Sequence, residues 1–242
     1  MLRTQTHSDW PSLAVRIDGA LKPLAAPIAI TFDASSASER FSDREYPAPS
    51  ETGRTGAVAA GCVFWIHATE RTFVTAPADH GNCSVGSYTH GLLRGADAVS
   101  KDDVQAILSA GWVSEADFGA LPALTTSPTA ITYGPLTAAV DPDVVLLRLN
   151  GLGLMTVKDA FPDLNISGKP QCHIVPQALL SGAPCASVGC ALSRARTGMR
   201  AEEMTCAVPA KGLEDFVERV EAAVALDRAM ARYASQDAKR FG

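Results

Sequence analysis

The sequence predicts an α+β fold, a mixed sheet with helices in one compact domain spanning residues 1–242. The length, with 47% hydrophobic and 19% charged residues, is sufficient to bury a core. Short apolar runs separated by turn residues indicate strands. Long helical patterns do not alternate regularly with these runs, so we do not expect a parallel doubly wound sheet.

The chain should begin with a helix at residues 10–24, followed by a strand at 28–32 that is entered through Pro27. The polar stretch 34–56 then predicts an extended loop. Such a loop is either a solvated excursion or a mobile lid over a site.

Two runs rich in β-forming residues, 62–66 and 72–76, lie on either side of a polar turn and predict a hairpin. A helix is expected at 102–110. Its predicted N-terminal cap is Ser100, with Asp103 at the spacing of a capping box.

After a short helix at 115–121, further strands are expected at 130–133 and 144–149. The second of these is a continuous apolar run, which fits a strand buried on both faces. Residues 212–233 carry apolar side chains at helical spacing, with two arginines near the C-terminal end, where cations suit the helix dipole. This is the clearest helix in the sequence.

Charge and patterning exclude several classes of function. The net charge is -5 and the 21 lysines and arginines form no basic stripe, so we expect no nucleic-acid partner. The first ten residues lack a signal-peptide pattern, and no apolar run approaches the roughly 20 residues needed to cross a bilayer. We therefore expect a cytoplasmic protein without a membrane partner. Because disulfides are rare in the cytoplasm, its six cysteines are free for packing, metal binding or reactive chemistry.

The most informative stretch is 80–90, which holds two of the five histidines, His80 and His90, and one cysteine, Cys83. Cys83 precedes Ser-Val-Gly, which we expect to open a helix whose positive end favours a thiolate. A thiolate binds metals or attacks electrophiles. The two histidines are then metal ligands, proton shuttles or hydrogen-bonded structural residues.

A second cysteine cluster contains Cys172, Cys185 and Cys190, followed by Arg194 and Arg196. Small residues around the last two cysteines would let a bulky cofactor approach the backbone. Thiolates beside arginines suit an iron-sulfur cluster or an anionic substrate. The arginines alternatively pair with one of the glutamates at 202 and 203. Neither a ferredoxin-type spacing nor any CxxC pair occurs, so a zinc ribbon is excluded.

Two halves, 25–125 and 126–235, suggest an internal duplication. Cys62 precedes Cys83 by 21 residues and Cys172 precedes Cys190 by 18. The sequence Cys-Ser-Val-Gly-Ser in the first half also resembles Cys-Ala-Ser-Val-Gly-Cys in the second. A duplicated unit would bring the four cysteines together across a pseudo-twofold axis. Chance similarity between short stretches of small residues is the competing explanation.

Over residues 27–233 the chain resembles the family called domain of unknown function 169. The resemblance is carried by DHGNCSVGSYTHG, by YGPL followed by PDVV, by the region of Cys172, and by SVGCALSR with EEM and Ala-Val-Pro downstream. It implies a bacterial or archaeal cytoplasmic protein with recurring cysteines, here Cys62, Cys83, Cys172 and Cys190. The family pattern has Gly-Asn-Arg after the last cysteine, whereas this chain has Leu-Ser-Arg. The resemblance therefore leaves Arg194 as the carried-over candidate.

The leading hypothesis is an iron-sulfur enzyme, an oxidoreductase or lyase acting on a small molecule. Its cluster would be held by Cys62, Cys83, Cys172 and Cys190. The catalytic candidates around it are Cys83, His80, His90 and Arg194. An oxidoreductase of this kind could use an electron-transfer partner, and the sequence leaves both this partner and formation of a homo-oligomer open.

Two alternatives belong to other classes. In one, Cys83 is a metal-free nucleophile with His80 or His90 as its base. In the other, the protein is a non-catalytic sensor that binds haem or another large cofactor through histidine or cysteine. The common nucleotide-binding, hydrolase and zinc-protease motifs are absent from the sequence.

Overall fold

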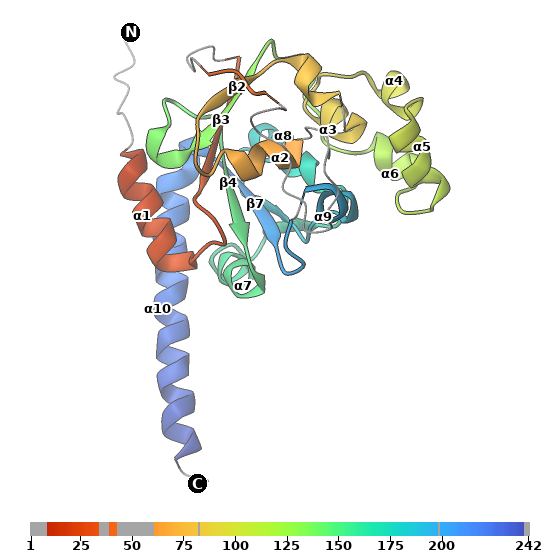
Figure 1. Cartoon of the computed structure of the whole chain (residues 1–242). Coiled ribbons are helices and arrows are strands. Elements are labelled where there is room, and N and C mark those ends of the chain that lie inside the picture. Colours follow the sequence, from red (N-terminus) through yellow and green to blue (C-terminus); the bar gives the residue numbers. More distant parts are fainter. Residues whose placement is uncertain (1–8, 34–38, 43–60, 82, 198, 240–242) are drawn as a thin grey trace.

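The computed structural model describes residues 9–33, 39–42, 61–81, 83–197 and 199–239 (Figure 1). Its centre is a seven-stranded sheet in the order β2-β3-β1-β4-β7-β6-β5. The outer strands β5 and β6 are parallel and all the other neighbouring pairs are antiparallel. The fold is therefore α+β with a mixed sheet, as the sequence predicts. The strands are β1 (Ile28–Phe32), β2 (Phe73–Thr75), β3 (Ile131–Pro135), β4 (Val144–Leu149), β5 (Asn165–Ser167), β6 (Cys185–Ser187) and β7 (Met204–Pro209).

Helices cover both faces of the sheet. One face packs against α1 (Trp10–Leu21), α7 (Gly151–Ala160) and α10 (Leu213–Ala238). Figure 1 shows α10 running beside α1 and then projecting beyond the body of the molecule. The other face carries α2 (Gly61–His67), α3 (Ser84–Thr89), α4 (Gly95–Val99), α5 (Asp102–Ser109), α6 (Glu115–Gly119), α8 (Ile174–Ser181) and α9 (Ala191–Thr197). We call this second side the cysteine face.

The central strands supply both cores because their side chains alternate between the two faces. Ile28 and Ile30 point into the core of the cysteine face, whereas Ala29 between them joins the core under α1 and α10. All six residues of β4 are buried. This explains why the predicted strand at 144–149 is a continuous apolar run. In the described part of the chain, no helix is both long and apolar enough to span a bilayer.

The predicted hairpin at 62–66 and 72–76 is only half right. The second run contains β2, but the first forms helix α2 instead of a strand. A short apolar run does not distinguish a buried strand from a buried helix. Here the three consecutive residues Val63, Phe64 and Trp65 are all buried, so the helix shows no clear division into an apolar and a polar side.

The predicted cap of the helix at 102–110 is also wrong. The cap position of α5 is Lys101, and the Ser100 hydroxyl donates to the carbonyl of Asp97. Asp103 instead accepts a hydrogen bond from the backbone N–H of Ser84 at 2.9 Å, at the start of α3. Most of the predicted loop 34–56 lies outside the described residues. In its described part, Phe41 is buried in the core of the cysteine face.

Two three-stranded units within the sheet share the same register. In one, β3 ends at Pro135 opposite Ile28, the first residue of β1. In the other, β7 ends at Pro209 opposite Val144, the first residue of β4. Each proline precedes a short 3-10 turn. The third strands, β2 and β6, both begin opposite the residue two positions before the proline. Such matching registers would follow from duplication of one unit, although the duplication itself stays a prediction.

A buried ion pair lies where β4 meets the segment before β7. The guanidinium of Arg148 donates to both carboxylate oxygens of Glu203, at 2.6 and 2.8 Å. Both side chains are almost fully buried. Loss of one partner would leave the other charge in a medium that solvates it poorly. The pair therefore fixes the segment that leads into β7.

We expect Arg148→Met to lower the free energy of unfolding by about 3–5 kcal/mol, because Glu203 would remain buried without a counterion. The double variant Arg148→Met with Glu203→Met should recover most of this loss. Urea denaturation of the four proteins in this mutant cycle measures both effects. A loss below about 1 kcal/mol in the single variant would contradict the assignment, since that is the range of exposed ion pairs.

Candidate functional site

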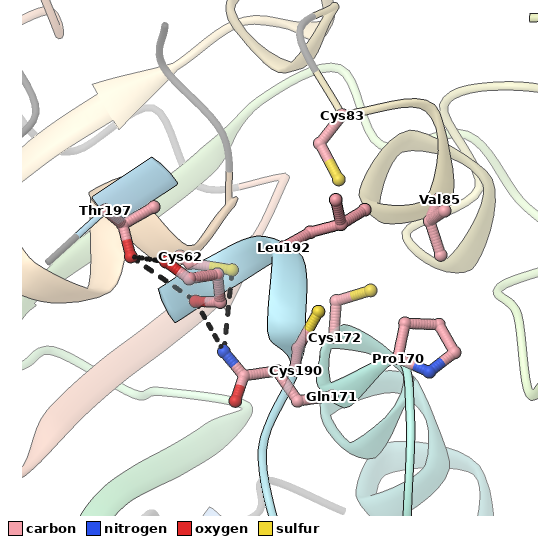
Figure 2. A pocket seen from close by; sticks show the side chains of 10 residues that line it. Cys62, Cys83, Val85, Pro170, Gln171, Cys172, Cys190, Leu192 and Thr197 are labelled. Atoms are coloured by element: carbon pink, nitrogen blue, oxygen red, sulfur yellow. Dashed lines mark hydrogen bonds between the residues drawn. The ribbon is translucent and has the colours of Figure 1, made fainter. Parts of the chain in front are cut away.

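Four of the six cysteines line one pocket on the cysteine face. Its cavity volume is only about 20 Å³, room for about one water molecule, and the surface that lines it is almost entirely apolar. Figure 2 shows the side chains of these cysteines around a common space that also contains Leu192. The lining residues are Cys62, Cys83, Val85, Pro170, Gln171, Cys172, Cys190, Leu192, Ser193 and Thr197.

Each of the four cysteines lies at the start of a helix. Cys62 is the second residue of α2, and Cys83 is the N-terminal cap of α3. Cys172 lies in a 3-10 turn that continues into α8, and Cys190 directly precedes α9. These helices stand on the same face of the sheet, so their first turns meet. Residues separated by more than a hundred positions are thereby brought together.

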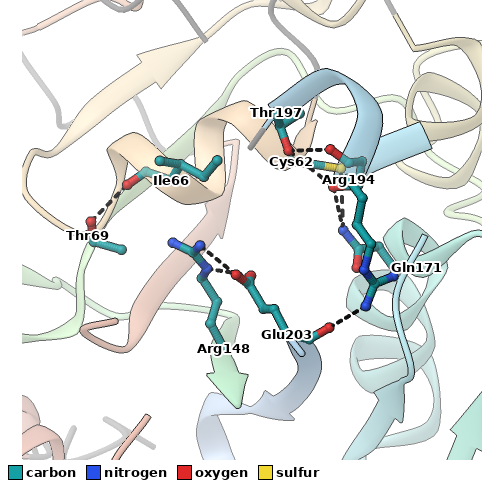
Figure 3. Close-up of polar contacts among 9 residues, drawn as sticks. Cys62, Ile66, Thr69, Arg148, Gln171, Arg194, Thr197 and Glu203 are labelled. Carbon is teal, nitrogen blue, oxygen red and sulfur yellow. Dashed lines mark hydrogen bonds and ion pairs between the residues drawn. The ribbon is translucent and has the colours of Figure 1, made fainter. Parts of the chain in front are cut away.

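The loop that carries Cys190 depends on Arg194. Its guanidinium donates to the backbone carbonyls of Val188 and Ala201 at 3.2 and 3.1 Å. It also donates to the backbone carbonyl of Glu203 at 2.8 Å (Figure 3). Gly189 has a φ of +110°, and a Cβ there would stand 2.4 Å from the guanidinium. Only glycine leaves room for this contact. Arg194 thus holds the loop rather than presenting its charge to a substrate.

Arg194 therefore makes a different contact from the ion pair considered from the sequence. It contacts the backbone carbonyl of Glu203, while the carboxylate of the same residue binds Arg148. Figure 3 shows this continuous set of contacts from β4 to the cysteine loop. The side chain of Arg196 lies outside the described part of the chain.

Hydrogen bonds converge on the sulfur of Cys62. Gln171 Nε2 donates to Cys62 Sγ at 3.5 Å and to Ser193 Oγ at 3.0 Å. The hydroxyls of Ser193 and Thr197 are 3.3 Å apart. On the other side of the pocket, Thr89 interacts with the thiol of Cys172.

Burial keeps the thiols of Cys62 and Cys172 protonated. It raises the pKa of Cys62 to about 12, and the charges that Cys190 and Cys83 would carry as thiolates raise it further. Burial also raises the pKa of Cys172 well above its ordinary value, again reinforced by the other three cysteines. Each thiolate would therefore disfavour the next one. The four sulfurs can ionise together only when positive charge enters the pocket.

The pocket is not arranged for a single metal ion. No group of three or more histidine, cysteine, aspartate or glutamate side chains could hold one ion, as far as the described residues extend.

His80 and His90 are buried behind the pocket and are not part of its wall. Thr75 Oγ1 lies 2.9 Å from His80 Nε2. His90 Nδ1 lies 3.0 Å from the carbonyl oxygen of Gly86, while its Nε2 has no hydrogen-bond partner among the described residues. Burial lowers the pKa of His80 to about 3 and that of His90 to about 4. Both rings are neutral at physiological pH and belong to a buried aromatic cluster.

The other two cysteines lie outside the pocket wall. Cys185 in β6 donates to the carbonyl of Ile174 at 3.1 Å, and burial raises its pKa to about 12. Cys206 is fully buried in β7, on the opposite face of the sheet, as its alternating strand pattern indicates. The structure thus separates four cysteines that share a pocket from two that serve packing.

Sequence reasoning did not single out Gln171, Ser193 or Thr89. Gln171 could have been noticed because it is next to Cys172 in the sequence. Ser193 is one of the two positions at which the chain differs from the Gly-Asn-Arg pattern described above. Thr89 had no local signal, since its relation to Cys172 depends on how α3 packs against the turn before α8. These residues surround the thiols without contributing a sulfur.

Because His80 is buried in its neutral form, we expect the protein to lose stability in acid. Because the folded-state pKa of His80 lies below the ordinary value of about 6.5, the unfolded chain binds more protons as the pH falls. The free energy of unfolding should decrease from about pH 6.5 downward, toward the folded-state pKa near 3. His80→Gln should show a smaller decrease between pH 7 and 5 in urea denaturation. An equal decrease in both proteins would contradict the assignment.

Comparison with known proteins gives one family. The model of domain of unknown function 169, described as uncharacterised ArCR, matches residues 16–219. No significant match was found among curated proteins or among solved structures. The match covers most of the chain and includes all four pocket cysteines. The chain therefore belongs to the family called domain of unknown function 169.

Proposed function

We propose that this protein binds one iron-sulfur cluster and uses it for electron transfer or for activation of a small molecule. The proposed ligands are Cys62, Cys83, Cys172 and Cys190. The observation that carries the proposal is their convergence on one apolar pocket from four separate helix starts. Four cysteines form the usual ligand set of iron-sulfur clusters.

Electrostatics supports a polycationic ligand. In an apolar pocket, four thiolates without a cation would repel one another and would be poorly solvated. Iron ions would compensate this charge, so binding would release the thiol protons. The pocket is thus stable in the protonated form and suited to cluster assembly, in which metal replaces protons.

Geometry favours a cluster over a single ion. A tetrahedral zinc site with Zn–S bonds of ~2.3 Å would bring its sulfurs within about 4 Å of one another. The described side chains form no such group. A four-iron cluster gives each thiolate its own iron, so its ligands surround a larger volume. The four-cysteine donor set suits this arrangement, and the cavity of about 20 Å³ would have to widen to admit the cluster.

The other pocket residues would shape the cluster environment. A cluster with four cysteine ligands would supply one-electron transfer to a partner or to a small molecule. Leu192, Val85 and Pro170 would exclude water, which lowers the local dielectric constant and helps set the reduction potential. Arg194 would hold the loop of Cys190. The partners we propose are an electron-transfer protein and a small-molecule substrate, in the reducing environment of the cytoplasm.

The two alternatives have less support. A base with a pKa near 3 or 4 would be inefficient at neutral pH, which disfavours His80 or His90 as activator of a Cys83 nucleophile. Haem ligation would need a histidine or cysteine facing a wide cavity. His80 and His90 are instead enclosed behind the pocket.

Replacement of any one pocket cysteine by serine should lower the iron and sulfide content of anaerobically purified protein to less than half of the wild-type value. The physical reason is that one of the four ligand bonds to the cluster is lost. Chemical assays of iron and sulfide measure the effect. The absorption at about 400 nm, which arises from sulfur-to-iron charge transfer, gives a second measure of cluster content.

The matched controls are Cys185→Ala and Cys206→Ala, which alter buried thiols outside the pocket wall. They should keep wild-type iron while losing some stability through the space they leave. A colourless wild-type protein without iron after anaerobic reconstitution would refute the proposal. Equal iron loss in the controls and the pocket variants would also refute it.

A further inference from the structure

Gln171, which lies next to Cys172, is hydrogen-bonded to Cys62 from the first half of the chain. Gln171 donates one Nε2 hydrogen bond to Cys62 Sγ and another to Ser193 Oγ, at 3.5 and 3.0 Å. The side chain is 1% exposed and lines the pocket. Figure 2 shows its amide between Cys62 and the elements that carry Cys172 and Cys190.

Two hydroxyls hold this amide in place. Ser193 Oγ accepts one N–H of Gln171, and it also lies 3.3 Å from Thr197 Oγ1. Thr197 in turn donates to the backbone carbonyl of Ser193 at 2.7 Å. With one N–H fixed by Ser193, the planar amide directs the other toward the sulfur of Cys62.

The oxygen of the same amide receives no hydrogen bond from the described residues. Gln171 Oε1 is buried and has no hydrogen-bond partner in the part of the chain that the structure describes. A buried carbonyl without a partner costs free energy. The placement of this glutamine is therefore better explained by what its N–H groups do than by its contribution to stability.

We propose that Gln171 raises the reduction potential of the cluster through the sulfur of Cys62, an inference that rests on the proposed function. In the redox step one electron enters the cluster from a one-electron donor, and no ligand bond breaks. The thiolate carries more negative charge in the reduced state. An N–H donor therefore stabilises the reduced state more than the oxidised state. Gln171 is a positioning and tuning residue, because its amide acts through Cys62.

The test compares Gln171→Met with the wild-type protein after anaerobic reconstitution. The variant should keep its iron but show a roughly tenfold lower equilibrium constant for reduction, which is about 59 mV in a one-electron couple. Potentiometric titration followed by electron paramagnetic resonance measures the midpoint. Ser193→Ala, which frees the amide and also removes the hydrogen bond of Ser193 to Cys62, should shift the midpoint in the same direction.

The matched control is Gln105→Met. Gln105 is exposed on α5 and donates to the carbonyl of Val99, so its replacement should leave the midpoint unchanged. An unchanged midpoint in Gln171→Met with full iron content would overturn the inference. Iron loss from that variant with its circular dichroism intact would also overturn it, in favour of a role in assembly. Absence of iron from the wild-type protein is a separate result, which refutes the proposed function itself.

Discussion

The mutual repulsion of buried thiolates is the constraint on which the site depends. Burial and neighbouring sulfurs raise the pKa of Cys62 and Cys172, so these two thiols are stable in the protonated form. On a solvent-exposed surface such groups could ionise one at a time. In this pocket the two thiols would lose their protons together only if positive charge entered. A cation in the pocket would therefore change the charge state of both cysteines.

The sheet provides the rigidity that this coupling requires. Its two units with matching register place α2 and α3 beside α8 and α9 on the same face. The buried pair of Arg148 and Glu203 fixes the segment before β7, and Arg194 connects that segment to the loop of Cys190. Cys190 is therefore held by a series of contacts that begins at Arg148 in the central strand β4. The opposite face, under α1 and α10, supplies packing.

Short apolar runs between turn residues, and one long helical pattern near the C-terminus, made much of the fold predictable. Strands 28–32 and 144–149 were predicted with their observed bounds, since both are dominated by buried apolar side chains. Helix α2 was not predictable, because its consecutive buried apolar residues imitate a strand. Strands β5 and β6 are three residues long, too short for any period to be recognised.

The candidate site followed from cysteine chemistry more than from local structure. The sequence indicated that four cysteines in two similar halves would meet, and the pocket brings these four together. The roles of the histidines and of Arg194 could not be deduced, since burial and backbone contacts decide them. Gln171 was also beyond sequence reasoning, because its partner Cys62 is 109 positions away.

The most direct test of the central claim is a crystal structure of anaerobically purified protein, with anomalous diffraction measured on both sides of the iron absorption edge. We expect one group of iron peaks in the pocket, within bonding distance of the sulfurs of Cys62, Cys83, Cys172 and Cys190. Disulfides between these cysteines, or an anomalous signal from a single zinc ion held by only some of them, would contradict the account.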